Sequence, residues 1–213
     1  MNKLTLRFET LLNELVKCNT FADVGCDHGL VANEMLSRGK CSFAYITDVS
    51  AVCLQKAESL LKKHFDGKFE PIVTDGLKNV PKVDQVLIAG MGGELICDIL
   101  SKADFLPNNL VLQPMKNADK VRKNALKLGY KLVKDYTFND GKYYDLIVCE
   151  KGEDSYSELE IEFGRDNLRD KGDAFCEVIR KKLDIVNKAI LTAGLEEKQR
   201  LYDLKRKYEE IIL

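Results

Sequence analysis

Phe21-Ala-Asp-Val-Gly-Cys-Asp-His-Gly29 is the most informative stretch of the chain. An apolar run ends here in Asp-x-Gly, and the residues that follow carry apolar side chains at helical spacing. This pattern predicts a strand, a tight turn and a helix, which open a nucleotide-binding α/β sheet. Glycine permits a sharp turn and a close approach to a ligand, and the start of a helix offers free N–H donors.

Asp27 distinguishes this turn from the dinucleotide pattern G-x-G-x-x-G. In that pattern the second glycine faces a pyrophosphate, which a carboxylate would repel. A ligand with positive charge and no phosphate suits the turn better, and S-adenosylmethionine (AdoMet) carries a sulfonium and an α-ammonium. A plain strand-to-helix connection without a ligand is the alternative interpretation.

Length and composition indicate one full domain plus an appendage. The 213 residues are 45% hydrophobic and 31% charged, which is ordinary for a soluble globular protein. The formal net charge of −1 gives no overall sign of nucleic-acid binding, so a polyanion would need local basic patches.

Cysteine usage predicts a reduced cytosolic protein with neither disulfides nor a zinc site. No two cysteines form C-x-x-C, and only two histidines are present. The segment Met1–Arg7 lacks an apolar signal core, and no apolar run reaches membrane-spanning length. We therefore expect a cytoplasmic protein with no metal and no membrane association. The seven cysteines are Cys18, Cys26, Cys41, Cys53, Cys97, Cys149 and Cys176.

The next two predicted strands, 42–48 and 68–75, also end in acids. Before the first strand we expect an amphipathic helix at 4–17. Asp48 follows Gly25 at about the spacing of a ribose-binding carboxylate, although it could instead cap the helix 52–65. Ser50 is an equally good cap. Asp75 ends the third strand, where Pro71 indicates a sheet edge. Because such strand ends converge on one crevice, the acids favour a ligand site there.

Val83-Asp-Gln-Val-Leu-Ile-Ala-Gly-Met-Gly-Gly93 is the second informative stretch, followed by a predicted helix at 94–100. Three glycines in four residues indicate a very close backbone approach or positive φ angles. In a methyltransferase sheet this fourth strand faces the reacting methyl and the target atom. The run is not the Asn/Asp-Pro-Pro-aromatic motif, and no Pro-Cys dipeptide supplies a thiolate nucleophile. A flexible loop at a helix start is the alternative.

The remaining pattern completes one α/β sheet. A fifth strand, 105–113, ends in Gln113-Pro114, whose amide could bind a base edge or cap the next element. A helix at 116–129 precedes two alternating runs, 130–138 and 143–149, around the turn Asn139-Asp-Gly-Lys142. Five βα units closed by an antiparallel hairpin form the class I, Rossmann-like, AdoMet-dependent methyltransferase layout.

The composition changes after Glu150. Residues 151–155 indicate a linker, and acidic and apolar residues then alternate through Phe163. From Asp173 onward the pattern is helical, with a break at Gly194. We predict an αα-hairpin zipped as a short coiled coil. We therefore expect a catalytic domain at 1–152 and a helical domain at 153–213. The helical domain contains two basic clusters, 180–182 and 205–207, which either contact phosphates or form a solvated face balanced by acids.

Four motifs together closely resemble the bacterial tRNA (adenine-22-N1)-methyltransferase family. The Ala-Gly-Met-Gly-Gly run beside an Asp-His loop is quite specific, and the helical tail matches that family's C-terminal coiled coil in kind. The family commonly has Asp-His-Ala-Tyr-Leu-Pro in the loop, where this chain has Asp-His-Gly-Leu-Val-Ala, and Phe-Gly-Pro where it has Phe163-Gly-Arg165. The motifs are Asp23-Val-Gly-Cys-Asp-His-Gly29, Ile88-Ala-Gly-Met-Gly-Gly93, Leu112-Gln-Pro114 and Asp140-Gly-Lys-x-Tyr144.

The resemblance implies methyl transfer from AdoMet to adenine N1 in tRNA, and we expect a monomer. Asp27 and Asp75 would hold the two ends of the cofactor and Asp48 its ribose. The implied cofactor-binding residues are Gly25, Cys26, Asp27, His28, Gly29, Asp48, Val49, Asp75, Gly76, Ala89 and Gly90. The implied catalytic residues, which shape the pocket around the base, are Asp27, His28, Met91, Gly92 and Gln113. The implied substrate-binding residues are Arg7, Gly93, Pro114, Tyr144, Arg180, Lys181, Lys205 and Arg206.

Two other functions remain open at this point. A class I methyltransferase could act on a small molecule or a protein, with the tail as a dimerisation or lid element. A non-catalytic RNA- or nucleotide-binding module could also retain a vestigial cofactor site. For His28, a core or helix-start position is the alternative to a site role.

Overall fold

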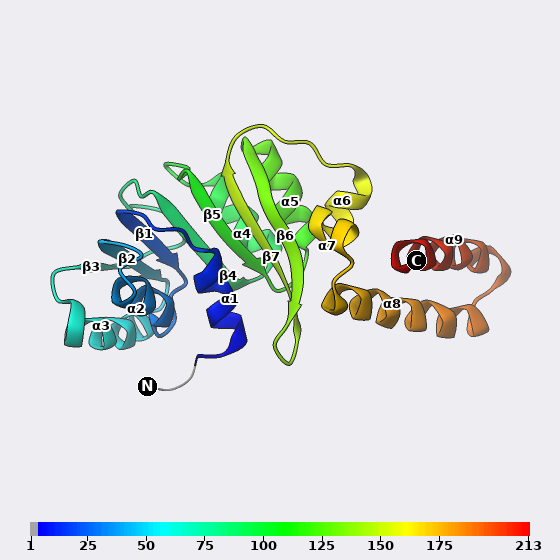
Figure 1. The fold of residues 1–213 in the computed structure, drawn as a ribbon, viewed down its shortest axis with the longest axis horizontal. Helices are drawn as coiled ribbons and strands as arrows, with labels where there is room; N and C mark the ends of the chain where they lie inside the picture. The colour runs from blue at the N-terminus through cyan, green and yellow to red at the C-terminus, as the bar shows by residue number, and fades with distance from the viewer. Residues whose placement is uncertain (1–3) are drawn as a thin grey trace.

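Seven strands form one mixed sheet in the order β3-β2-β1-β4-β5-β7-β6 in the computed structural model, which describes residues 4–213 (Figure 1). Strands β1 to β5 pair in parallel, and β7 runs antiparallel to both β5 and β6. The strands are β1 Thr20–Val24, β2 Phe43–Asp48, β3 Phe69–Val73, β4 Gln85–Met91, β5 Asn109–Pro114, β6 Tyr130–Asn139 and β7 Tyr143–Lys151.

The strand order confirms the predicted class I sheet. From β1 the chain moves outward to β3 and then crosses back to β4, so the direction of winding reverses between β1 and β4. Open α/β sheets bind ligands at the carboxyl end of such a switch point. Pro71 lies in β3, an edge strand, and the 139–142 turn joins the β6–β7 hairpin as predicted.

Helices cover both faces of the sheet. The chain segments α1 Leu6–Glu14, α2 Leu30–Ser37 and α3 Ala51–Phe65 bury apolar stripes in one core cluster, and α4 Gly93–Ser101 and α5 Ala118–Lys127 bury theirs in another. The strand side chains alternate between these two cores because successive residues point to opposite faces. Each helix follows the predicted 3.6-residue periodicity.

After β7 the tail consists of four helices and their connecting segments. The acid–apolar alternation before Phe163 is a short helix that begins with a capping box: Ser157 Oγ accepts from Glu160 N, and the Glu160 carboxylate accepts from Ser157 N. The predicted αα-hairpin is confirmed, with Gly194 at the break, whereas its supercoiling stays a prediction. The helices are α6 Glu158–Phe163, α7 Arg165–Asp170, α8 Asp173–Thr192 and α9 Leu195–Ile212.

The first part of the tail covers the exposed edge of β6. Asp166 Oδ2 accepts from Asp135 N at 2.8 Å, and Asn167 Oδ1 accepts from Thr137 N at 2.8 Å. These side chains pair backbone donors that an edge strand otherwise leaves open. Arg165, which stands in the Phe-Gly-Pro position of the resemblance, pairs with Asp154 at 3.1 Å.

A third apolar cluster joins the two helical parts of the tail. Phe163 packs edge-on against Phe175 and Tyr208, each with ring centroids 6.2 Å apart. In Figure 1 α8 and α9 project away from the sheet, beyond α6 and α7. Helices α6 and α7 thus contact the sheet on one side and the projecting hairpin on the other.

All seven cysteines are free thiols. Across residues 4–213 the structure gathers no group of three His, Cys, Asp or Glu side chains suited to hold a metal ion. In the same part of the chain, each helix is too short or too polar to cross a bilayer.

Candidate cofactor and substrate pocket

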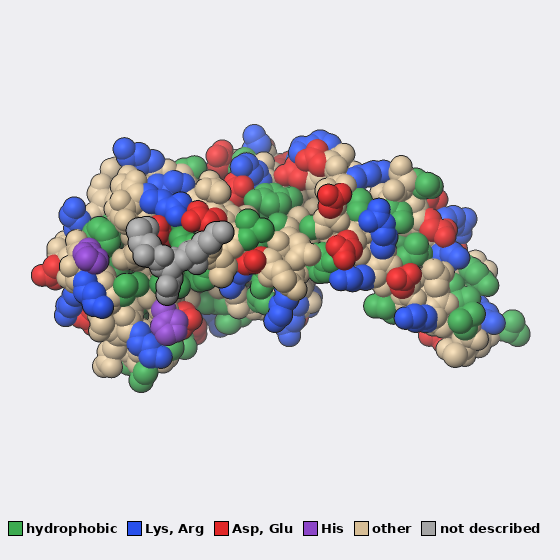
Figure 2. All heavy atoms as spheres, turned by 60° about the horizontal axis from the view of Figure 1, so that its bottom comes forward, with side chains coloured by type: hydrophobic (Ala, Val, Ile, Leu, Met, Phe, Trp, Pro, Cys, Tyr) green, Lys and Arg blue, Asp and Glu red, His purple; other side chains and the backbone are tan. Residues whose placement is uncertain are grey.

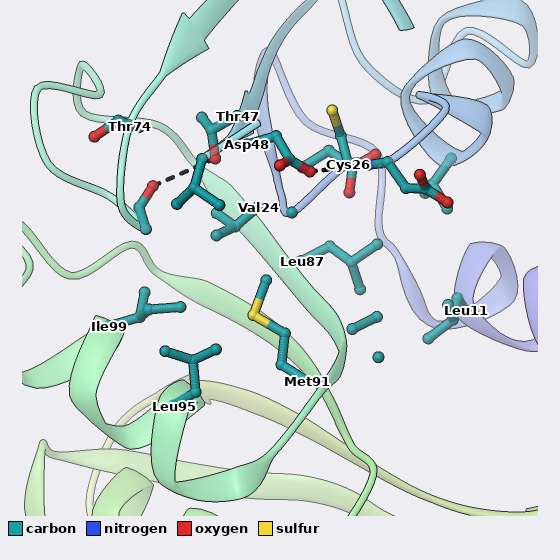
Figure 3. A pocket seen from close by; sticks show the side chains of 18 of the residues that line it. Leu11, Val24, Cys26, Thr47, Asp48, Thr74, Leu87, Met91, Leu95 and Ile99 are labelled. Carbon is teal, nitrogen blue, oxygen red and sulfur yellow. Dashed lines mark hydrogen bonds between the residues drawn. The ribbon is translucent and has the colours of Figure 1, made fainter. Parts of the chain in front are cut away.

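A cavity of about 390 Å³ opens at the carboxyl ends of β1, β2 and β4 (Figure 3). Small-molecule sites in proteins have volumes in this range and occur at such switch points. The cavity brings together these residues predicted from the sequence: Arg7, Gly25, Cys26, Asp27, Asp48, Val49, Asp75, Gly76, Ala89, Gly90 and Met91.

The β1–α2 turn keeps backbone close to the ligand space. The N–H groups of Gly25 and Cys26 both donate to Thr47 O, at 2.8 and 2.9 Å, which ties the turn to the end of β2. Gly25 has φ +69°, and a Cβ there would collide with the Met91 methyl group. Figure 3 shows Met91 projecting from β4 into the pocket. The left-handed conformation therefore favours glycine at this position, and a Cβ would also require the flexible Met91 side chain to move.

Asp48 is held at the end of β2 by backbone donors. Its Oδ1 accepts from Ser50 N at 2.8 Å, and its Oδ2 accepts from Asp27 N at 3.4 Å. The α3 cap is Ser50, whose Oγ accepts from Cys53 N at 3.3 Å. The cap alternative for Asp48 is thus wrong, and its carboxylate lines the pocket. Asp27 has φ +49°, and its side chain is 71% exposed.

Asp23 is a pocket residue that our sequence analysis did not single out. It is 4% exposed, lines the cavity, and its Oδ2 has no hydrogen-bond partner among residues 4–213. Burial raises the pKa of Asp23 to about 7, which the Ala32 N–H partly opposes and the nearby Asp48 reinforces. The aspartate of the Asp-x-Gly pattern near the end of β1 was the available signal, because a buried carboxyl needs a partner.

Gln113 lies outside the cavity and is fully buried. Its Oε1 accepts from Arg7 Nε at 2.8 Å, and its amide nitrogen donates to Pro114 O at 3.1 Å. The helix after β5 is preceded by Asn117 in the left-handed region, without a side-chain cap. The amide therefore neither faces a base nor caps a helix, because both ends of it have partners within the protein.

His28 and Gly29 also lie outside the cavity lining. The His28 side chain is 52% exposed, with Nε2 3.7 Å from Asp27 Oδ1. Gly29 has φ +69° at the start of α2, where a Cβ would come within 2.8 Å of Ala57 Cβ. The structure thus accounts for this glycine by helix packing, and His28 sits at a helix start.

The glycines at the end of β4 and in the following loop are explained by different structural constraints. Gly90 adopts φ +80°, whereas Gly93 packs so closely on the carbonyls of Lys116 and Asn117 that a Cβ would overlap both. Gly92 has φ −66° and lies near the Lys116 side chain. Gly93 and Gly92 therefore fit the β4–α4 loop against the β5–α5 loop, outside the cavity lining.

The other predicted substrate residues do not form one site. Pro114 is buried in β5 opposite Met91, and the Tyr144 ring contacts Arg7 and stacks on Phe138 at 5.4 Å. Lys181 Nζ donates to Tyr143 Oη at 3.0 Å, which connects α8 to the β6–β7 hairpin.

Two of the remaining basic tail residues have acidic neighbours. Arg206 pairs with Asp203 at 2.5 Å and Lys205 with Glu209 at 3.7 Å. In Figure 2 basic, acidic and hydrophobic side chains are mixed along the tail. Arg180 is exposed, with no ion-pair partner in the described part of the chain.

The strand order and the glycine-lined acidic pocket define a class I, Rossmann-like methyltransferase fold. A family model described as a methyltransferase domain matches residues 4–147. The chain belongs to this methyltransferase family, within its TrmK-like group.

Relatives of known name support this placement. The chain is 30% identical to the tRNA (adenine(22)-N(1))-methyltransferase of Bacillus subtilis over 158 residues, 71% of this chain and 66% of the relative. It is 33% identical to a Mycoplasma pneumoniae protein named as a candidate tRNA methyltransferase, over 55% of this chain and 57% of the relative. The alignments thus span less than two thirds of these relatives.

Solved structures resemble the chain over its whole length. A Streptococcus pneumoniae protein, described as a candidate tRNA (m1A22) methyltransferase and solved with S-adenosyl-L-methionine, is 25% identical with a TM-score of 0.88. That match covers 99% of this chain and 100% of the other. The Bacillus subtilis TrmK structure has the same fold, with a TM-score of 0.85 over the full length of both chains.

Proposed function

We propose that the protein is an AdoMet-dependent tRNA methyltransferase that forms 1-methyladenosine at adenine 22 in the D-arm. The acidic, glycine-lined pocket at the switch point is the observation that carries this proposal. The names of the relatives and the AdoMet in a solved neighbour support the same activity. The proposal takes the protein to act as a monomer, and action on tRNA implies a cytoplasmic location.

The residues in the pocket fit AdoMet. Asp23 presents a buried carboxylate oxygen that lacks a partner, which suits a cationic ligand. Gly25 leaves room beside the backbone, and Asp48 directs its carboxylate into the cavity from the end of β2, suited to ribose hydroxyls. Asp27 and Asp75 add negative charge at the rim.

Bound AdoMet supplies an electrophilic methyl group on its sulfonium. Adenine N1 carries an in-plane lone pair, so the site needs no base to remove a proton before attack. The protein's contribution is alignment and stabilisation of the positive charge on the product base. The four carboxylates that line the cavity, Asp23, Asp27, Asp48 and Asp75, favour this charge.

The target N1 lies on the Watson–Crick edge of adenine. A paired adenine must therefore be unpaired or flipped to enter the pocket. We expect the α8–α9 hairpin, which projects from the sheet (Figure 1) and carries Arg180 and Lys181 on α8, to contact the RNA outside the pocket.

Removal of positive charges from the helical tail should weaken tRNA binding without changing AdoMet binding. In the triple variant Arg180→Gln, Lys205→Gln, Arg206→Gln, we expect a higher KM for tRNA and an unchanged Kd for AdoMet. The salt dependence of tRNA binding should become shallower by roughly one unit of slope per lost phosphate contact. The exposed pair Lys56→Gln, Lys63→Gln on α3 is the matched control. An unchanged salt slope in the triple variant would remove the tail from the RNA-binding surface.

The affinity for AdoMet should depend on pH through Asp23. Because burial raises its pKa to about 7, Asp23 is protonated below that pH, and we expect the Kd for AdoMet to fall about fivefold to tenfold from pH 6 to pH 8. Conversely, the free protein should lose stability as the pH rises from about 4 to about 7, because only the unfolded Asp23 ionises readily there. Calorimetric titrations of the wild type and of Asp23→Asn measure this. The same pH profile in both proteins would exclude Asp23.

Transfer of labelled methyl from AdoMet to unmodified bacterial tRNA tests the proposed activity. Label in the RNA supports a tRNA methyltransferase. Tight AdoMet binding without label in RNA would favour the alternative of a small-molecule or protein substrate. Loss of AdoMet binding altogether would favour a non-catalytic module.

A further inference from the structure

Arg7 is the one basic residue that lines the cavity within residues 4–213. The charged groups around it, Asp23, Asp27, Asp48 and Asp75, are all carboxylates. This cation would be repelled by the sulfonium and the α-ammonium of AdoMet, so its partner is either the AdoMet α-carboxylate or an anion of the substrate, which the AdoMet affinity of an Arg7 variant distinguishes. Its position therefore calls for an anionic partner.

Arg7 is fixed at both its backbone and its side chain. Its backbone N–H donates to Asp140 Oδ2 at 3.0 Å, and Arg7 Cζ lies 5.2 Å from the centre of the Tyr144 ring. Its Nε donates to Gln113 Oε1 at 2.8 Å. Asp140 and Tyr144 belong to the β6–β7 hairpin region, so the hairpin tip helps to set the arginine over the end of β4.

Gln113 fixes the guanidinium orientation. Its side chain is fully buried, and its amide nitrogen is occupied by Pro114 O, so its oxygen can point only toward Arg7. A buried amide held in this way restricts the rotation of its partner. Gly90 provides the space: a Cβ there would lie 2.9 Å from Arg7 Nη2.

The remaining guanidinium donors are available to a ligand. Gln113 occupies Nε, and the structure gives Nη1 and Nη2 no acceptor among residues 4–213. Two parallel N–H groups of one guanidinium match two oxygens of a phosphate. A contact with the base itself is disfavoured, because methylation makes the base cationic and a nearby guanidinium would oppose that charge.

We propose that Arg7 binds the backbone phosphate of the target adenosine, and that Gln113 is a positioning residue that orients it. This inference rests on the proposed function, since it assumes a nucleotide in an RNA chain. The phosphate would anchor the flipped nucleotide on the side of the pocket where Arg7 contacts Gln113 and Tyr144, and leave the base to the acidic interior. In this contact the guanidinium of Arg7 would donate two charge-assisted hydrogen bonds to two oxygens of the phosphate.

A chemical double-mutant cycle tests this proposal. The substrates are tRNAs that carry a neutral methylphosphonate at the linkage on the 5′ or the 3′ side of the target adenosine, compared with native tRNA. The enzymes are the wild type, Arg7→Met and Gln113→Leu, each checked for thermal stability and AdoMet affinity. Relative kcat/KM values give the coupling.

We expect one methylphosphonate to lower kcat/KM of the wild type about tenfold to 100-fold. Arg7→Met should lose a similar factor on native tRNA and almost nothing further on the methylphosphonate. Gln113→Leu should show an intermediate loss with partial coupling, which a merely structural role would not produce. If the loss in kcat/KM from Arg7→Met and the loss from the methylphosphonate simply multiply at both linkages, the proposed phosphate contact is wrong. If the wild type fails to methylate native tRNA, the proposed function itself fails, separately from this inference.

Discussion

Replacement of Arg122 by methionine is expected to lower the free energy of unfolding by about 3–5 kcal/mol. Arg122 is 1% exposed on α5, and its Nε lies 2.9 and 2.8 Å from the two oxygens of buried Asp135 on β6. Its Nη1 also donates to Ile161 O at 3.2 Å, so it joins the catalytic sheet to α6. Removal of the arginine leaves a buried carboxylate without its counter-charge. Urea denaturation measures the loss.

The partner variant separates the cost of an unpaired charge from lost packing. Burial raises the pKa of Asp135 to about 6 even beside Arg122, so an unpaired carboxylate would be still harder to ionise. The double variant Arg122→Met, Asp135→Leu removes both charges and should recover part of the stability. Lys123→Met, at an exposed neighbouring position on the same helix, should change stability by less than about 0.5 kcal/mol. A loss below about 1 kcal/mol in Arg122→Met would contradict this account of the junction.

Replacement of Asp48 by alanine is expected to weaken AdoMet binding at least about 100-fold. A carboxylate that accepts from two ribose hydroxyls makes two charge-assisted hydrogen bonds, each worth about 1.5–3 kcal/mol. Each 1.4 kcal/mol corresponds to about a factor of ten in Kd. Isothermal titration of AdoMet into the wild type and the variant measures the change.

The control for Asp48 must retain its local structural role. Asp48 also accepts from Ser50 N and Asp27 N, so the alanine variant removes turn contacts together with the ligand contact. Asp48→Asn retains one acceptor of the same shape and should lose about tenfold in affinity while keeping its melting temperature. Affinity within about twofold of wild type in both variants would show that the ribose does not contact Asp48.

The sequence allowed the sheet and much of the pocket lining to be predicted because both follow from local patterns. Gly25, Asp27, Asp48 and Asp75 each end or follow a strand, and parallel strands bring their carboxyl ends together. The β6–β7 hairpin followed from its turn residues. These features depend on neighbours in sequence and on the known behaviour of parallel sheets.

Contacts between distant residues were not visible in the same way. Gln113 and Arg7 are 106 positions apart, and nothing local shows that a buried amide will serve an arginine rather than a base. Arg122 lies among exposed lysines on α5, although the tertiary fold buries it against β6 and α6. Likewise, the composition change that predicted a boundary at 152–153 gave no sign that α6 and α7 pack on the edge of the sheet. Side-chain pairing across the fold decides these points, and sequence periodicity carries no record of it.

Mapping of the methylated nucleotide tests the central claim most directly. Unmodified tRNA and a transcript with guanosine in place of adenosine 22 are incubated with the enzyme and labelled AdoMet, and the labelled nucleotide is located after nuclease digestion. The account predicts 1-methyladenosine at position 22 of the first RNA and no label in the second. Equal labelling of the two RNAs, or label at another nucleotide, would contradict the assignment of adenine 22.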